Sequence, residues 1–308
     1  MDRILNSRMI RILGTIFAGL LGLAFGSFLN VCLSRWPAGE SVIKPRSHCR
    51  NCDHTLAWWE NVPVVSWLFL RGRCRNCRGW IGWRYPVVEA AVGGLWAVVV
   101  WSSSAWAFAP DEPGANLFCE IAGIIGKMVF YWLLVALALL DAEHLWLPNF
   151  LTLPGTALGF IMFVLQFELA SGPTLSKYGA TALKQRFLFH MGFKWLLGIL
   201  AAADLILLIR WIYWLVRRRE GLGLGDAKLM ALLAAWLGLP GALLAFALGA
   251  VLGAGVALVL LAVPSARTNA KSWATSKLPL GTCLCMGGIV SSLWGQPIIA
   301  AYLRWAGF

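Results

Sequence analysis

The sequence predicts an all-α membrane protein with about eight transmembrane helices and a small cytoplasmic zinc-binding loop domain. Of its 308 residues, 59% are hydrophobic and only 13% are charged, whereas soluble domains carry about 25% charged residues. The apolar residues gather in runs of about 20, the length at which a helix crosses a bilayer. Many of the 18 tryptophans stand near the ends of these runs, as in the aromatic belts of membrane proteins.

The apolar runs assign the transmembrane helices in order. They cover residues 12–34, 86–108, 118–140, 147–168, 194–216, 226–239, 242–263 and 279–303. The sixth run is short because the turn signal Gly238-Leu239-Pro240-Gly241 precedes the seventh; the alternative is one long helix over 226–263. The first run exceeds the roughly 7–15 residues of a signal-peptide core, so we expect it to be retained. The expected divisions are a first transmembrane helix (1–34), a cytoplasmic cysteine loop (35–85) and a transmembrane core (86–308).

Loop charge predicts the orientation and accounts for the net charge of +12. Lys and Arg collect in the cytoplasmic loops of membrane proteins. Residues 35–85 carry nine of them against three acidic residues, so this loop is expected in the cytoplasm. Other basic residues fall on the same side (Arg217, Arg218, Arg219, Arg267, Lys271, Lys277), and the loop 169–193 is the exception (Lys177, Lys184, Arg186). No soluble basic domain is left over, so nucleic acid is not an expected partner.

Two aspartates stand at the expected cytoplasmic boundary of the membrane. Asp141 ends the third apolar run and Asp226 opens the sixth. Ionisable groups at such a boundary are costly to bury and usually mark function. Two carboxylates held close together share one proton, so that one can activate water while the other protonates a scissile carbonyl. We therefore expect Asp141 and Asp226 to be the catalytic pair of an aspartic protease.

Each aspartate taken alone has a simpler explanation. Asp226 follows a glycine-rich segment and suits a helix N-cap, and Asp141 can be a solvated acid at a helix end. Catalysis is favoured when both are considered together with Gly223 and Gly225. These glycines lack a Cβ, so a substrate strand can approach the backbone there, and we expect both to contact substrate.

The cysteines predict a metal site. Four of them form two Cys-x2-Cys pairs with 21 residues between the pairs: Cys49, Cys52, Cys74 and Cys77. This spacing is typical of a closed, structural zinc site, and disulfides are disfavoured in the cytoplasm. His48 and His54 flank the first pair and are alternative ligands. The other four cysteines (Cys32, Cys119, Cys283, Cys285) lie in apolar runs and are expected to be buried hydrophobes.

Other polar residues within or beside the helices have open roles. Glu89 is either a solvated acid near a helix start or part of a site that holds substrate or cofactor. Asp204 and Asn30 lie inside apolar runs and are expected to bond to neighbouring helices, with a functional role as the alternative for Asp204. Lys228 is expected to extend to the interface, with an influence on the charge of the aspartate pair as the alternative.

Together the motifs resemble the bacterial type IV prepilin peptidases over nearly the whole chain. The matching segments are Gly26–Pro37, the cysteine pairs, Asn61–Leu68, Arg84–Glu89, Asp141 with Leu147-Pro148-Asn149, Gly221-x-Gly223-x-Gly225-Asp226 and Leu278-Pro279-Leu280-Gly281. The loop 169–193 is long for the family, and the family is not expected to have an acid at Asp204. Four positions in the motifs also depart from the family pattern. Leu280 stands where phenylalanine is usual, Thr282-Cys283 where proline and an aromatic residue are common, and Ala227 where a bulky aromatic residue is frequent.

The resemblance implies an aspartic endopeptidase of the GxGD type in the bacterial inner (cytoplasmic) membrane. Such enzymes cut the basic leader from type IV prepilins or type II secretion pseudopilins after a glycine, on the cytoplasmic side. Many then methylate the new N-terminus with S-adenosylmethionine. No motif in the sequence indicates where that methyl donor binds.

Two other classes of function share some of these features. Signal-peptide-peptidase and presenilin-like proteases have GxGD but lack the tetracysteine loop, and their first aspartate usually follows tyrosine, where this chain has Leu140. A zinc-loop assembly factor or a proton-coupled transporter would use the same aspartates as proton carriers and would release no leader fragment.

Overall fold

The computed structural model describes residues 2–103, 115–176, 181–219, 223–262 and 279–307. Six residues named in the sequence analysis lie outside these ranges: Lys177, Gly221, Arg267, Lys271, Lys277 and Leu278. The side chains of Lys184 and Arg186 are also not described. The chain folds into two compact units, Met1–Ala136 and Leu137–Phe308, and each is considered by itself.

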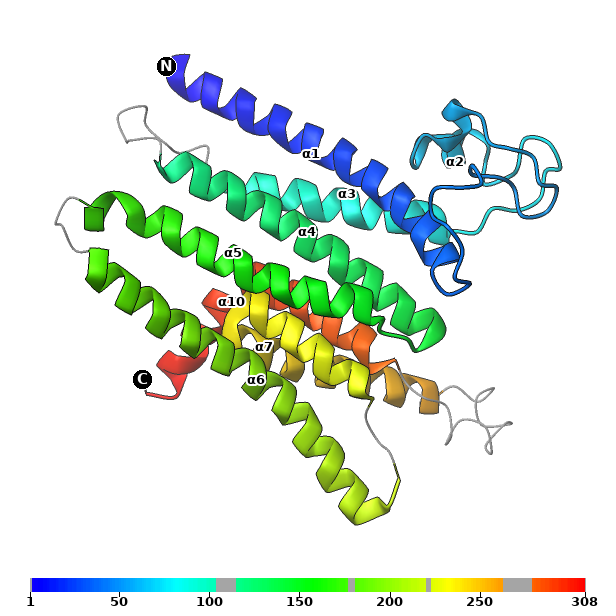
Figure 1. The fold of residues 1–308 in the computed structure, drawn as a ribbon. Helices are drawn as coiled ribbons and strands as arrows, with labels where there is room; N and C mark the ends of the chain where they lie inside the picture. Colours follow the sequence, from blue (N-terminus) through cyan, green and yellow to red (C-terminus); the bar gives the residue numbers. More distant parts are fainter. Residues whose placement is uncertain (1, 104–114, 177–180, 220–222, 263–278, 308) are drawn as a thin grey trace. The chain divides into compact units, whose positions relative to one another are not determined.

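Nearly all of the described chain is helical (Figure 1). The elements are α1 (Asp2–Arg35), η1 (Trp58–Asn61), α2 (Val65–Phe69), α3 (Arg84–Ser102), α4 (Ala115–His144), α5 (Asn149–Ser176), α6 (Thr181–Arg217), α7 (Leu224–Ala262) and α10 (Leu280–Trp305). Seven helices of the described residues, all except η1 and α2, are long and apolar enough to cross a membrane. The predicted all-α membrane fold is therefore confirmed.

The sixth and seventh predicted spans lie in one element, α7, which is why seven helices qualify and not eight. A straight helix of 39 residues would extend about 58 Å, almost twice the roughly 30 Å of a bilayer core. The helix does not run straight: Gly238 has φ 71° and ψ 170°, which breaks the helical backbone. The break falls within the predicted turn at 238–241.

Contacts on either side of Gly238 show that the chain reverses there. Before the break, Trp236 Nε1 donates a hydrogen bond to Gly155 O and Lys228 Nζ donates one to Asn149 Oδ1, so this arm runs parallel to α5. After the break, Ser291 Oγ donates to Gly241 O. A Cβ placed on Gly249 would lie 3.0 Å from Leu284 Cα. Gly241 thus contacts the later residue of α10 and Gly249 the earlier one, so the second arm runs antiparallel to α10.

The first unit is built on close packing of α1 against α3. A Cβ placed on Gly22 would lie 2.8 Å from Gly93 Cα, and one on Gly26 would lie 2.7 Å from Glu89 Cα. Small residues allow helix backbones to approach in this way inside membranes. Asn30 Nδ2 also donates a hydrogen bond to Tyr85 O at 3.0 Å, which confirms the expected bond to a neighbouring helix. The cysteine loop connects the ends of these two helices (Figure 1).

Candidate active site and metal centre

Asp141 lies in the last turn of α4, facing the start of α10. Its Oδ2 accepts hydrogen bonds from the backbone N–H of Thr282 at 2.7 Å and from the Thr282 hydroxyl at 3.2 Å. The first N–H groups of a helix have no partner inside the helix, and the dipole there favours negative charge. Asp141 supplies both the acceptor and the charge. The residue is only 6% exposed, so it is not the solvated acid considered from sequence.

Asp226 lies in the first turn of α7 and is 8% exposed. Helix α7 begins at Leu224, so Asp226 is its third residue and not its N-cap. The Asp226 Oδ2 atom accepts a hydrogen bond from the N–H of Gly223 at 3.1 Å. This is the backward half of a capping box. In both aspartates, therefore, a backbone N–H holds Oδ2 as an acceptor.

The two aspartates lie at the same end of the second unit, around the side chain of Leu147. A Cβ placed on Gly225 or on Gly281 would lie 3.1 Å from Leu147 Cδ1. The same Cβ on Gly281 would lie 2.9 Å from the carboxyl group of Asp141. Asp226 follows Gly225 directly in the chain, so Leu147 lies close to both predicted aspartates.

The glycines of the second motif differ in their surroundings. Gly225 is packed against Leu147, where a larger residue would be crowded. Gly223 is exposed, and its backbone N–H donates a hydrogen bond to Asp226 Oδ2. Lys228 Nζ donates to Asn149 Oδ1 at 2.6 Å and so ties α7 to the start of α5. Asp204 is exposed on α6 and is not among the groups that contact the aspartate pair.

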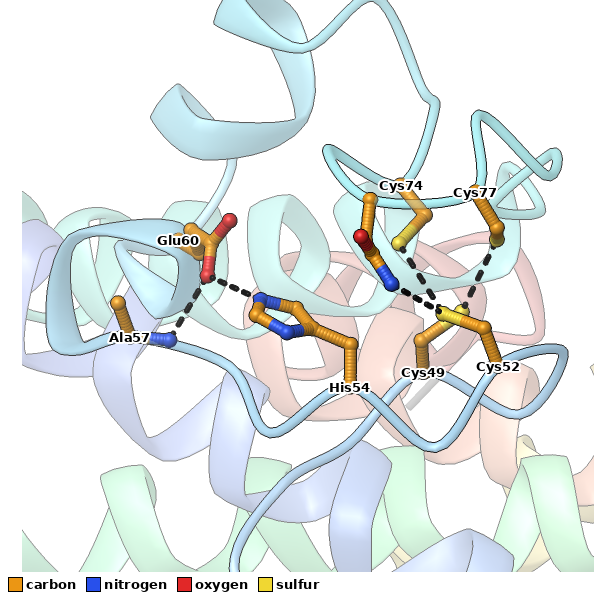
Figure 2. A network of polar contacts seen from close by, with 8 residues as sticks. Cys49, Cys52, His54, Ala57, Glu60, Cys74 and Cys77 are labelled. Carbon is orange, nitrogen blue, oxygen red and sulfur yellow. Dashed lines mark hydrogen bonds and ion pairs between the residues drawn. The ribbon is translucent and has the colours of Figure 1, made fainter.

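The four predicted metal-ligating cysteines meet in the first unit (Figure 2). All four sulfur atoms lie within 4.8 Å of one another. Cys49 and Cys77 are 3.8 Å apart, and Cys52 and Cys74 are 3.9 Å apart. A tetrahedral zinc ion with Zn–S bonds of about 2.3 Å requires sulfurs about 3.8 Å apart. The cluster therefore fits a four-thiolate metal site.

Two turns of matching geometry present the sulfurs. The N–H of Asp53 donates to Cys49 O, and the N–H of Arg78 donates to Cys74 O, each at 2.9 Å. Asp53 and Arg78 have positive φ values of 53° and 55°, which turn the chain back after each cysteine pair. The backbone N–H of His54 lowers the pKa of Cys52 to about 6. The lowered pKa favours the thiolate that a metal binds.

The two histidines considered as alternative ligands have other partners. His54 Nε2 lies 3.4 Å from Glu60 Oε2, which also accepts the N–H of Ala57 at 2.8 Å (Figure 2). His48 Nδ1 lies 3.1 Å from Arg46 O. Among the described residues, the four cysteines are therefore the group that could hold a metal ion.

Comparison with known proteins places this geometry in a family. A model of the bacterial peptidase A24 N-terminal domain matches residues 20–103, and one of the type IV leader peptidase family matches residues 128–258. A prepilin leader peptidase/N-methyltransferase of Stutzerimonas stutzeri is 32% identical over 93% of this chain and 93% of the relative. One of Pseudomonas aeruginosa is 32% identical over 94% and 93%.

The chain belongs to the prepilin leader peptidase/N-methyltransferase family. A type 4 prepilin-like proteins leader peptide-processing enzyme of Escherichia coli is 33% identical over 90% of this chain and 92% of its own length. No solved structure matches the chain. The leader-peptidase match contains Asp141 and Asp226, and the N-terminal match contains the four cysteines and Glu89.

Glu89 is a buried residue of this family's N-terminal domain. It is 7% exposed, so the solvated acid considered from sequence is wrong. Its Oε2 accepts the N–H of Val64 at 2.7 Å, and the Ser27 side chain bonds to the same carboxyl group. Val64 has φ 58°, a strained conformation for a β-branched residue. Glu89 thus joins α1, α3 and the segment that follows the first cysteine pair.

Sequence reasoning missed the contacts of Thr282, Leu147 and Val64. In the sequence, Thr282 stands out only as a departure from the family pattern, although a threonine in the first turn of a predicted helix does signal a hydrogen-bonding role. No local signal places Leu147 between two glycines, because that contact joins three segments far apart in the chain. The positive φ of Val64 also has no local signal, because its N–H bonds to Glu89, which is 25 residues away in the sequence.

Proposed function

We propose that this chain is a membrane aspartic endopeptidase that removes the leader from type IV prepilins or type II secretion pseudopilins and then N-methylates the new N-terminus. In this proposal, Asp141 and Asp226 are the catalytic pair. Cleavage follows a glycine on the cytoplasmic side of the bacterial inner membrane, and the peptide backbone approaches Gly223 and Gly225. The names and extensive match of the relatives support the reaction class.

The observation that carries the proposal is the matched bonding of the two carboxyl groups. Thr282 N–H and Gly223 N–H each donate to an Oδ2 atom. A backbone N–H cannot reverse its direction, so each Oδ2 stays an acceptor. A proton shared by the pair then belongs on the Oδ1 side. In the proposal, the pair holds one carboxylate and one carboxylic acid, as water activation requires.

The chemistry follows from that division. The carboxylate takes a proton from water as the water oxygen bonds to the scissile carbonyl carbon. The carboxylic acid gives its proton to the carbonyl oxygen. When the carbon–nitrogen bond breaks, the carboxylic acid gives its proton to the leaving amine. A hydroxyl group of the diol intermediate gives its proton to the carboxylate, so the pair returns to its starting state. Water is the nucleophile, so no covalent enzyme intermediate forms.

Loop composition and the cysteine cluster support the remaining parts. The nine basic residues of 35–85 favour a cytoplasmic loop, and Trp214 to Arg219 carry further positive charge at the end of α6. Zinc bound by four thiolates has no open position, so its proposed role is to hold the loop together. Cys49, Cys52, Cys74 and Cys77 would be its ligands.

The test is cleavage of a prepilin peptide by the purified, full-length protein in detergent. Asp141→Asn and Asp226→Asn are each expected to lower kcat by roughly a hundredfold or more, because general acid–base catalysis is lost. The leader fragment is measured by mass spectrometry. Asp204→Asn is the matched control, since this acid is exposed on α6, and it should cleave normally. Cleavage at the normal rate by either Asp141→Asn or Asp226→Asn contradicts the proposal.

A further inference from the structure

The side chain of Leu147 fills the space between the two glycines beside the aspartates. A Cβ placed on Gly225 would lie 3.1 Å from Leu147 Cβ and Cδ1, and one placed on Gly281 would lie 3.1 Å from Leu147 Cδ1. Carbon atoms in favourable contact are about 3.5–4.0 Å apart, so neither glycine leaves room for an added methyl group. Leu147 is half-buried, so the rest of its side chain is open to a bound peptide.

The leucine and the Asp141 carboxyl group meet over the same bare backbone. A Cβ on the buried Gly281 would lie 2.9 Å from Asp141 Cγ and Oδ2, as well as 3.1 Å from Leu147 Cδ1. Gly281 is in the first turn of α10, where the N–H of the next residue, Thr282, donates to Asp141 Oδ2 at 2.7 Å. The carboxyl group and the leucine side chain are therefore fixed relative to each other.

The backbone on both sides of Leu147 is also fixed. Leu145 has φ 50°, and its N–H donates a hydrogen bond to Asp141 O at 2.9 Å. Pro148 follows Leu147 and restricts it to extended backbone. The N–H and the hydroxyl of Thr152 both donate to Pro148 O at 3.1 Å. Because this connection is held at each end, the backbone that carries Leu147 does not move aside easily for a substrate.

The chemistry of peptide hydrolysis places one substrate residue against this leucine. The carbonyl carbon that water attacks belongs to the residue before the scissile bond, and the Cα of that residue is only about 1.5 Å from it. The carbonyl oxygen must reach the aspartate pair to be protonated. A side chain on that Cα would therefore begin beside Asp141 and Asp226, where Leu147 already stands.

We propose that Leu147 limits the substrates of this chain to those with glycine before the scissile bond. The inference rests on the proposed function, because it explains why the proposed cleavage follows a glycine. Glycine has only a hydrogen where any other residue would carry a side chain against Leu147. Even one methyl group must displace the leucine or hold the carbonyl away from the carboxyl groups, because the site is already filled. Leu147 is thus a specificity-determining residue that transfers no proton.

The experiment compares two prepilin peptides that carry glycine or alanine before the scissile bond and are otherwise identical. The purified, full-length protein should cleave the glycine peptide with the higher kcat/KM. Leu147→Ala removes the obstructing methyl groups, so we expect the ratio of the two kcat/KM values, glycine over alanine, to fall roughly tenfold. Leu147→Val should lower this ratio by a smaller factor. Leu147→Met has a similar volume and should preserve it.

A buried leucine of the same unit provides the matched control. Leu233 is buried on α7, about two turns beyond Asp226. Leu233→Ala makes the same truncation away from the aspartates. We expect this variant to lower the Tm, because it creates a cavity, and to keep the ratio of the unaltered protein. An equal fall of the ratio in Leu233→Ala would show that general loosening admits alanine, and the inference would fail.

The outcomes separate this inference from the proposed function. If the unaltered protein cleaves neither peptide, the proposed function fails and the inference fails with it. If it cleaves both peptides equally well, or if Leu147→Ala and Leu147→Val keep its ratio, only the inference is overturned. Loss of all cleavage by both variants at an unchanged Tm would show that Leu147 serves the reaction itself, which also contradicts the inference. Should Leu147→Ala show no thermal transition, Leu147→Val decides alone.

Discussion

At the scale of single residues, Thr282 decides how Asp141 is held. Its backbone N–H and its hydroxyl both reach Asp141 Oδ2, and the hydroxyl proton is shared with Ala138 O at 2.9 Å. Proline is common at this place in the family pattern and has no N–H to donate. In this chain, the start of α10 therefore makes a bond to the Asp141 carboxyl group that a proline would not make.

The hydroxyl of Thr282 can be tested apart from its N–H. Thr282→Val keeps the shape and the backbone donor but removes the hydroxyl bond. Hydrogen bonds to charged groups are worth about 1.5–3 kcal/mol, so we expect kcat/KM for prepilin cleavage to fall roughly tenfold. Thr282→Ser restores the hydroxyl and should recover most of the rate. Normal cleavage by Thr282→Val would show that the hydroxyl does not support Asp141.

At the scale of elements, α7 shows how one glycine determines the path of a long apolar segment. Composition alone describes residues 224–259 as one span. Gly238, with its positive φ, and Pro240 just after it break the segment into two arms. The glycine also faces Trp195, because a Cβ there would lie 3.0 Å from the ring. The turn could be predicted from the Gly-Leu-Pro-Gly signal, whereas the contact with Trp195 could not.

The reversal predicts a local cost for adding a side chain. Gly238→Ala places a Cβ at a positive φ and against Trp195, so we expect the protein to lose about 1–2 kcal/mol of stability. The apparent Tm in detergent should fall accordingly. Gly255→Ala in the second arm meets nothing within 4 Å and should leave the Tm unchanged or slightly raised. Equal Tm values for the two variants would argue against a strained turn at Gly238.

The cysteine loop is the second element with a direct test. Each chain is expected to bind about one zinc ion, measured by elemental analysis, because four thiolates complete a tetrahedron. Cys74→Ser should lose most of the zinc and make residues 36–83 sensitive to limited proteolysis. Cys119→Ser, in α4 outside the cluster, should retain it. Full zinc content in Cys74→Ser would remove Cys74 from the ligand set.

At the scale of the whole molecule, composition and spacing predicted most of the architecture, and tertiary contacts decided the rest. Apolar runs predicted the helices because bilayer thickness sets their length. The cysteine cluster followed from spacing, and the aspartate pair from position at helix ends. The burial of Glu89 and the support of Asp141 by Thr282 were not predictable, because each joins residues far apart in sequence.

The two compact units contain different candidate sites. The aspartates lie in Leu137–Phe308, and the metal cluster lies in Met1–Ala136. Variants in one unit are therefore expected to affect one site and spare the other. Pairing the leader-fragment assay with the zinc analysis on the same preparations measures this separation.

The length of the first arm of α7 has a consequence for where proteolysis takes place. From Leu224 to Leu237 the arm has about 14 residues and extends only about 21 Å, less than the roughly 30 Å thickness of the hydrocarbon layer. An arm this short spans the layer only if lipid thins around it or if its charged end sits below the headgroups. Either way, we expect Asp226 to lie below the membrane surface, so the proposed hydrolysis requires that water reach it there.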